Sequence, residues 1–448
     1  MKICFVPIDN RPVCYNLAKD IAAIDGSIEL FIPPREFLGD LRKNAGVNEI
    51  LDWIENLPEA DAMVLSLDTI AYGGLIPSRR GVNDKGEAEN FEDIKRRIER
   101  LKPLLNGKKV YAFSSIMRIS NNNYNEEEKE YWKDWGKKIF NYSYSGVNDG
   151  IPQDILEDYL ATRKRNFEIN KTYLDWGLNT LIFSKDDCAP KGFNVDEARE
   201  LERLGGKTKT GADEIPLTLL ARAVEKDIKV FVEFTEPDYK DCISNYEDVS
   251  IEKSVQGQLE LGGFTQVQSK DEADIILIVN NFIEKQGELV MGWETQAFNG
   301  VFTPPEKPYA VADVRFANGA DNNFVGQLLP QIDLKNFCGY AGWNTSANSL
   351  GSLLAGVKVK WRAEKYNDLA FRKLQIIRFL DDWAYQANVR SMINSPCDIK
   401  NLMRPYEEAL AGVFGKILPD EMVKYSFPWN RKFEIEVEIP QASLSSDC

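Results

Sequence analysis

The chain has 448 residues, of which 43% are hydrophobic, a composition typical of a folded protein with a large core. Its formal net charge of −15 argues against a nucleic acid partner, because binding to phosphates needs a basic surface. The chain contains no histidine, which excludes Ser-His-Asp and Cys-His catalysis and histidine-based metal sites.

The sequence also favours one cellular location over others. No apolar run approaches the roughly 20 residues that span a membrane, so we expect no membrane association. The opening segment, MKICFVPIDNRPV, becomes polar too early for a secretory signal. Seven cysteines are dispersed without a Cys-x-x-Cys pair, as is typical of reduced thiols in a core. These features predict a cytoplasmic protein.

Nine short apolar segments are predicted to be strands, and most are separated by amphipathic helical segments. Strands that alternate with helices predict parallel β-sheets with flanking helices, in a Rossmann-like or barrel-like α/β fold. Nine strands are too many for a plain eight-stranded barrel and also fit two open sheets. The predicted strands are residues 2–8, 28–33, 61–67, 109–116, 180–184, 229–234, 274–280, 309–316 and 336–342.

The pattern along the chain predicts three parts. Residues 1–215 form an N-terminal α/β domain, which contains a helical insertion over the polar, aromatic residues 122–178. Residues 216–360 form a second α/β domain. From residue 361 to residue 448 the pattern is mainly helical.

Polar side chains follow six of the predicted strands. In parallel sheets, ligands bind outside the carboxyl ends of the strands, because the loops converge there. We therefore expect seven of these side chains to surround one cleft: Asp9, Arg11, Asp68, Arg79, Asp187, Asn318 and Asn344. The candidate substrate-binding residues are Asn10, Arg11, Tyr72, Arg79, Arg118, Asp313, Asn318, Trp343, Asn344, Thr345 and Asn348.

Some polar residues in the sequence have an ordinary structural explanation. Asp213 and Asp321 each stand in a Gly-Ala-Asp triplet before a predicted helix, where a carboxylate favours the helix dipole. Arg378 and Asp382 share one face of a later predicted helix, and we expect them to form a buried ion pair.

Four motifs carry a resemblance to a known family. They are Asp9-Asn10-Arg11-Pro12, the stretch from Asp68 to Arg79, Asn318-Gly319-Ala320-Asp321 and Gly342-Trp343-Asn344-Thr345. Together they resemble a bacterial family catalogued as a domain of unknown function, DUF4127. The resemblance covers nearly the whole chain and implies a single functional unit, but it brings no activity with it.

Carboxylates are the strongest candidates for catalysis in a chain without histidine. Glycoside hydrolysis needs two carboxyl groups, one acid and one base or nucleophile. The sequence therefore favours a glycoside hydrolase acting on a small sugar or glycoside without a cofactor. Asp68 and Asp187 are the expected catalytic pair, with Tyr72 and Trp343 stacking on the sugar. Other aspartates that could take part are Asp9, Asp313 and Asp321.

Two further functions stay open at this point. In a Mg²⁺- or Mn²⁺-dependent isomerase, lyase or phosphohydrolase, Asp9, Asp187 and Asp321 would hold the ion, since oxygen ligands suit these hard cations. The chain could also be a non-catalytic sugar-binding protein.

Overall fold

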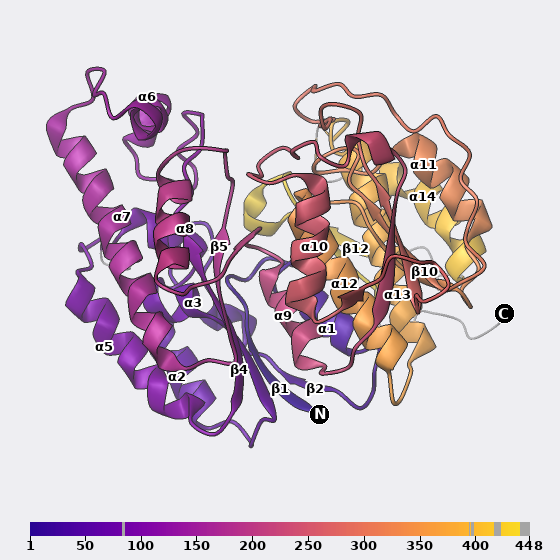
Figure 1. Cartoon of the computed structure of the whole chain (residues 1–448), viewed down its shortest axis with the longest axis horizontal. Helices are drawn as coiled ribbons and strands as arrows, with labels where there is room; N and C mark the ends of the chain where they lie inside the picture. Colours follow the sequence, from indigo (N-terminus) through magenta and orange to yellow (C-terminus); the bar gives the residue numbers. More distant parts are fainter. Residues whose placement is uncertain (83–85, 394, 396–397, 416–422, 440–448) are drawn as a thin grey trace. The chain divides into compact units, whose positions relative to one another are not determined.

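The computed structural model describes residues 1–448 except 83–85, 394, 396–397, 416–422 and 440–448 (Figure 1). The chain divides into two compact units, and each is built around its own parallel sheet. The first unit consists of Met1–Tyr15, Glu29–Leu219 and Tyr246–Asp248, and the second of Asn16–Ile28, Leu220–Asn245 and Val249–Cys448.

The first unit contains a six-stranded parallel sheet in the order β2-β1-β3-β4-β5-β6. The chain runs from β1 to one side of the sheet and returns to the other, so its direction of winding reverses between β1 and β3. The strands are β1 (Lys2–Val6), β2 (Glu29–Phe31), β3 (Ala62–Ser66), β4 (Lys109–Ile116), β5 (Thr180–Lys185) and β6 (Thr208–Thr210).

Helices cover this sheet because their apolar residues recur on one face. In α2 (Val47–Glu55), Val47, Ile50, Leu51 and Ile54 are all buried. Strand β3 is buried along its whole length, as expected for a strand with helices on both faces. The other helices of this unit are α3 (Leu67–Tyr72), α4 (Leu75–Arg80), α5 (Phe91–Leu101), α8 (Phe193–Arg203), and the 3-10 helices η1 (Arg35–Phe37) and η2 (Lys102–Leu105). Helix α9 (Ile215–Ala223) begins in the first unit and ends in the second.

The helical insertion expected over residues 122–178 is confirmed. It contains α6 (Trp132–Ser145), α7 (Gln153–Tyr173) and the 3-10 helix η3 (Leu174–Trp176), and α7 lies beside α5 in Figure 1. Trp132 and Tyr159 pack with their ring centroids 5.6 Å apart in a small core of the insertion.

The second unit contains a five-stranded parallel sheet in the order β11-β10-β9-β7-β8. Read from the other edge, the order is β8-β7-β9-β10-β11, so the strand that comes first in the sequence lies between the second and the third. The first five strands of the other sheet, β2-β1-β3-β4-β5, have the same order, although the sequence shows no repeat. The strands are β7 (Lys229–Phe234), β8 (Thr265–Gln266), β9 (Ile275–Asn280), β10 (Tyr309–Asp313) and β11 (Phe337–Ala341).

The C-terminal part is mainly helical, as predicted, and ends in an antiparallel pair of strands, β12 (Lys424–Ser426) and β13 (Glu436–Glu438). One segment, η6 (Phe379–Val389), is a π-helix, a rare conformation that is frequent at functional sites. The remaining helices of this unit are α1 (Asn16–Ala22), η4 (Pro237–Tyr239), α10 (Ile251–Gly262), α11 (Asn322–Leu328), η5 (Leu329–Gln331), α12 (Ser346–Arg362), α13 (Asp368–Arg378), α14 (Ile399–Phe414) and η8 (Pro428–Asn430).

The predicted fold class is thus confirmed, with two open parallel sheets rather than a closed barrel. All nine predicted strands are present. Strands β6, β8 and β12, of two or three residues each, were not predicted. Within the described parts of the chain, no helix is both long and apolar enough to cross a membrane.

Candidate functional site

In the first unit, the strand ends bring five polar segments to one edge of the sheet. Asp9 follows β1, Asp68 follows β3, Arg118 follows β4, Asp187 follows β5 and Asp213 follows β6. Strands β1 and β3 flank the point where the winding reverses, which is where open α/β sheets bind their ligands. This edge is the candidate active site.

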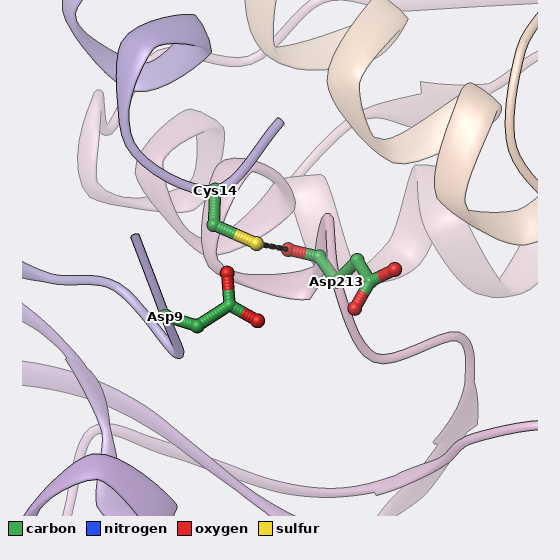
Figure 2. Close-up of side chains that lie close together, drawn as sticks. All are labelled: Asp9, Cys14 and Asp213. Carbon is green, nitrogen blue, oxygen red and sulfur yellow. Dashed lines mark hydrogen bonds between the residues drawn. The ribbon is translucent and has the colours of Figure 1, made fainter. Parts of the chain in front are cut away.

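Arg11 joins two of these carboxylates. Its Nη2 donates to Asp9 Oδ2 at 2.8 Å and to Asp213 Oδ1 at 2.6 Å. Cys14 lies beside them: one ligand atom each from Asp9, Cys14 and Asp213 lie within 4.8 Å of one another. Figure 2 shows the three side chains close together, with Cys14 Sγ bonded to the main-chain oxygen of Asp213 at 3.7 Å. Sequence analysis missed Asp213 as a site residue because β6 is too short to be recognised.

Two further arginines bind acidic side chains of the insertion. Arg118 Nε lies 2.8 Å from Glu128 Oε1, and its Nη2 lies 3.0 Å from Glu127 Oε2. Arg79, buried in the last turn of α4, contacts the same two glutamates at 3.3 and 3.6 Å. Neither glutamate follows a strand, so the strand-end rule could not identify them.

The same two arginines hold Asp186 and Asp187. Arg79 Nη2 binds Asp186 Oδ2, and Arg118 Nη1 lies 3.0 Å from Asp187 Oδ2. Burial and then the charge of Asp187 raise the pKa of Asp186 to about 7. Burial also raises the pKa of Asp187, while Arg118 and Arg79 oppose this rise. The side chains are 14% and 30% exposed, so both are open to solvent at the end of β5.

Asp187 also has an unusual backbone conformation. Its φ is +38°, a region that residues with a side chain rarely adopt and that is enriched at functional sites. The turn that carries the Asp186–Asp187 pair is therefore strained at Asp187.

Asp68 differs from the other strand-end aspartates of the first unit because it has no exposed surface. It lies in the first turn of α3, where its Oδ2 accepts from the Ser115 N–H at 2.7 Å and its Oδ1 from Ser114 Oγ at 3.3 Å. Burial raises its pKa to about 7. This carboxyl group is closed to a substrate in the structure. Its hydrogen bonds to Ser114 and Ser115 connect α3 to β4.

Replacing Asp68 by Asn should change how stability depends on pH. Protonated Asp68 stabilises the folded state fully below its unfolded pKa of 3.8, and this contribution disappears as the pH rises through about 7. Asn cannot ionise, so the free energy of unfolding of Asp68→Asn should rise relative to that of wild type by about 1.4 kcal/mol per pH unit between about pH 4 and 7. Thermal unfolding across this range measures the difference, with exposed Asp196→Asn as the control. Parallel curves for wild type and Asp68→Asn would contradict the assignment.

In the second unit, Asp313 ends β10 in a buried network. It accepts from Asn280 Nδ2 at 2.7 Å, Tyr340 Oη at 3.0 Å and the Asp321 N–H at 2.8 Å. Burial and the charge of Asp321 raise the pKa of Asp313 to about 7. Asp321 itself caps α11, since its side chain accepts from the Asn323 N–H at 2.9 Å. The ordinary helix-cap interpretation is therefore the one that the structure supports for Asp321.

The asparagines of the two glycine-containing motifs lie together in the second unit. The Asn318 N–H donates to the Asn344 main-chain oxygen at 3.2 Å. Asn348 Nδ2 donates to Thr345 Oγ1 at 3.1 Å and to Asn344 Oδ1 at 3.4 Å, and Thr345 begins α12 as its N-cap residue. Both Asn318 and Asn344 have positive φ, at 55° and 83°.

The two aromatic rings expected to stack on a sugar are both buried. Tyr72 lies in α3 with the Arg165 guanidinium 5.3 Å from its ring centroid. Trp343 packs edge-on against Phe433 with the ring centroids 5.7 Å apart. Neither ring offers a stacking surface in the structure, because protein side chains already cover it.

The candidate residues therefore form two groups, one in each unit, and the single cleft stays a prediction. The ion pair expected between Arg378 and Asp382 is confirmed, with Nε and Oδ2 3.4 Å apart and both side chains buried. The first group is Asp9, Asn10, Arg11, Asp68, Tyr72, Arg79, Arg118 and Asp187. The second group is Asp313, Asn318, Asp321, Trp343, Asn344, Thr345 and Asn348.

Comparison with known proteins identifies a family but no activity. No curated protein matches the sequence. A family model described as "Protein of unknown function (DUF4127)" matches residues 3–438, which include both sheets and all four motifs. The chain therefore belongs to the DUF4127 family.

Proposed function

We propose that the chain is a glycoside hydrolase that acts on a small sugar or glycoside through carboxyl groups of its first unit. The observation that carries this proposal is the Asp186–Asp187 pair at the end of β5, partly exposed and held by Arg79 and Arg118. Glycoside hydrolysis needs one protonated and one ionised carboxyl group, and the charge of an ionised carboxylate helps to keep a neighbouring carboxyl group protonated.

The surroundings of the pair suggest which residue holds the proton. Asp187 contacts Arg118 at 3.0 Å, which favours its ionised form. Asp186 also binds Arg79, but burial and the charge of Asp187 outweigh this contact and raise the pKa of Asp186 to about 7. In this proposal Asp186 is the general acid and Asp187 is the base or nucleophile. The pair replaces the combination of Asp68 and Asp187 expected from the sequence, because Asp68 is fully buried.

The charge of the site favours a neutral substrate rich in hydroxyl groups. Carboxylates outnumber guanidinium groups there by two to one, and each arginine binds at least two carboxylates. Such a site repels phosphate esters, whereas carboxylates accept hydrogen bonds from sugar hydroxyls. The charged residues are Asp9, Asp186, Asp187, Asp213, Glu127 and Glu128, with Arg11, Arg79 and Arg118.

A metal-dependent hydrolase is the second candidate, favoured by the grouping of Asp9, Cys14 and Asp213. A thiolate with two carboxylates suits Zn²⁺ better than Mg²⁺ or Mn²⁺. Arg11 weakens this candidate, because its guanidinium already supplies the positive charge between the two carboxylates. The sequence-based grouping of Asp9 and Asp187 with Asp321 has no such support, since Asp321 caps α11.

A panel of aryl glycosides in the presence of a chelator tests the proposal. Wild type should turn over at least one of them, and Asp187→Asn should lose about 10²–10⁴-fold of that rate, while exposed Asp196→Asn keeps it. Activity that the chelator abolishes and a divalent ion restores would instead support the metal-dependent candidate. Sugar binding without turnover would leave the non-catalytic sugar-binding function.

The expected cytoplasmic location is part of the same proposal. Cys4, Cys14, Cys188, Cys242 and Cys338 are free thiols in the structure, in keeping with a reducing compartment. Cys397 and Cys448 lie outside the described residues.

A further inference from the structure

Two glutamates of the insertion bind both of the arginines that hold the aspartate pair after β5. Glu127 Oε2 lies 3.0 Å from Arg118 Nη2 and 3.3 Å from Arg79 Nη1. Glu128 Oε1 lies 2.8 Å from Arg118 Nε and 3.6 Å from Arg79 Nη1. Each guanidinium group therefore contacts both glutamates as well as the aspartate pair.

The rest of the insertion fixes the place of these glutamates. Lys129, the next residue, donates from its Nζ to Asp158 Oδ2 at 2.6 Å and to Thr162 Oγ1 at 2.8 Å, and both acceptors lie in α7. Arg163 of the same helix donates to the main-chain oxygen of Arg118 at 3.1 Å. One helix of the insertion thus positions the two glutamates and one of the arginines that they bind.

The charges of this cluster determine whether the aspartate pair can hold a proton. A guanidinium group next to a carboxyl group favours its ionised form and lowers its pKa by about 1–3. The two glutamates supply two negative charges that balance the two guanidinium groups. Besides burial, the charge of Glu127 raises the pKa of Asp187. Burial and the charge of Asp187 then keep the pKa of Asp186 at about 7.

The other charged or titratable groups that face this cluster have partners or carry no charge. Besides burial and the closer charges, Asp213 after β6 raises the pKa of both aspartates, but Arg11 binds this carboxylate. Burial raises the pKa of the Cys188 thiol well above its usual value, so the thiol is uncharged near neutral pH. Arg80 interacts electrostatically with the two glutamates.

We infer that Glu127 and Glu128 are positioning residues, which balance the charge of the two arginines and thereby keep one proton on the aspartate pair near neutral pH. Neither glutamate has to touch a substrate for this role. The catalytic meaning of the inference rests on the proposed function, since a glycoside hydrolase needs one protonated carboxyl group. The charge balance belongs to the first unit itself and can be measured without a substrate. By this means the insertion sets the pH range in which the site works.

Carboxyl ¹³C NMR titration of the full chain, labelled at the aspartate γ-carbons, tests the inference. Asp186→Asn and Asp187→Asn assign the signals, and the wild-type pair should titrate with one pKa of about 7. Glu127→Gln keeps the size of the side chain and removes its charge, so it should lower this pKa by about 1 or more. Glu128→Gln should act in the same direction, which keeps the test available if one of the two variants does not fold.

The control variants separate charge from structure. Glu130→Gln changes a glutamate of the same segment that is 78% exposed and pairs with Lys133, and it should leave the pKa of the pair unchanged. Glu127→Asp retains the charge and should restore most of the wild-type value. An unchanged pKa in the folded glutamine variants, or an equal decrease in Glu130→Gln, would overturn the inference.

Activity measurements distinguish this inference from the proposed function. If wild type turns over an aryl glycoside, the alkaline fall in kcat should move to lower pH in Glu127→Gln together with the pKa. A lowered pKa in this variant, with a wild type that turns over no glycoside, would support the charge balance and contradict the proposed function alone.

Discussion

Replacing Asp186 by Asn should lower turnover of a glycoside with a poor leaving group by about 10²–10⁴-fold. The reason is that an amide cannot donate the proton that the departing oxygen needs. A dinitrophenyl glycoside, whose leaving group departs without protonation, should lose far less. The comparison of the two substrates separates a general acid from a residue that only holds the fold, since loss of structure would affect both substrates equally.

The pH profile gives a second measurement on the same variant. The pKa of Asp186 is about 7, so its acid form disappears as the pH rises through that value, and wild-type kcat should fall on the alkaline side. Asp186→Asn should lose this alkaline decline along with most of its activity. Asp196→Asn should keep the wild-type profile, because Asp196 is 69% exposed and pairs with Arg199 on the surface. A loss below tenfold, or an unchanged profile, would exclude Asp186 as the acid.

The strands could be predicted because each is a buried apolar run with turn residues at its ends. One predicted strand is longer than the strand in the structure, and the extra residues include the buried Arg315. The apolar pattern extends the predicted strand of residues 309–316 past Asp313, where β10 ends, so the predicted strand includes Arg315. In the structure Arg315 lies beyond the strand and is fully buried among polar partners.

The segment after β3 folds as α3 and α4, two helices that the sequence analysis did not predict. Signals for helices were present in the sequence. The Ser66 side chain accepts from the Thr69 N–H as an N-cap, and Gly73, with a φ of 85°, ends α3. A Cβ at Gly73 would lie 2.8 Å from the Cβ of Asn44, so a glycine is needed there. Recognition of this helix would have placed Asp68 and Tyr72 in its buried turns.

The sequence alone does not predict which residues of a distant segment contact the site. Glu127 and Glu128 come from the insertion, and only the folded chain shows that they bind Arg79 and Arg118. The strand-end rule found the aspartates and arginines of this cluster because parallel strands place their carboxyl ends on one edge. The strand-end rule does not predict which side chains of the long insertion lie at that edge.

Arg315 should be among the most sensitive positions of the second unit. Its Nη2 binds Glu236 Oε1 at 2.7 Å, its Nε lies 3.1 Å from Asn280 Oδ1 and 3.4 Å from Asp321 Oδ2, and its Nη1 donates to the Gln296 main-chain oxygen at 3.0 Å. Removal of one partner from a buried ion pair leaves an uncompensated charge and costs about 3–5 kcal/mol. Arg315→Met should destabilise the chain by that amount.

The control and the compensating variant separate lost charge from lost packing. Arg404→Met removes an exposed arginine that pairs with Glu408 at 3.2 Å, and it should change the free energy of unfolding by less than about 1 kcal/mol. Adding Glu236→Gln to Arg315→Met removes one of the stranded carboxylates and should recover part of the loss in urea unfolding. If the double variant is less stable than Arg315→Met by the full cost of Glu236→Gln alone, the two residues act independently, and Arg315 stabilises this unit through its shape rather than its charge.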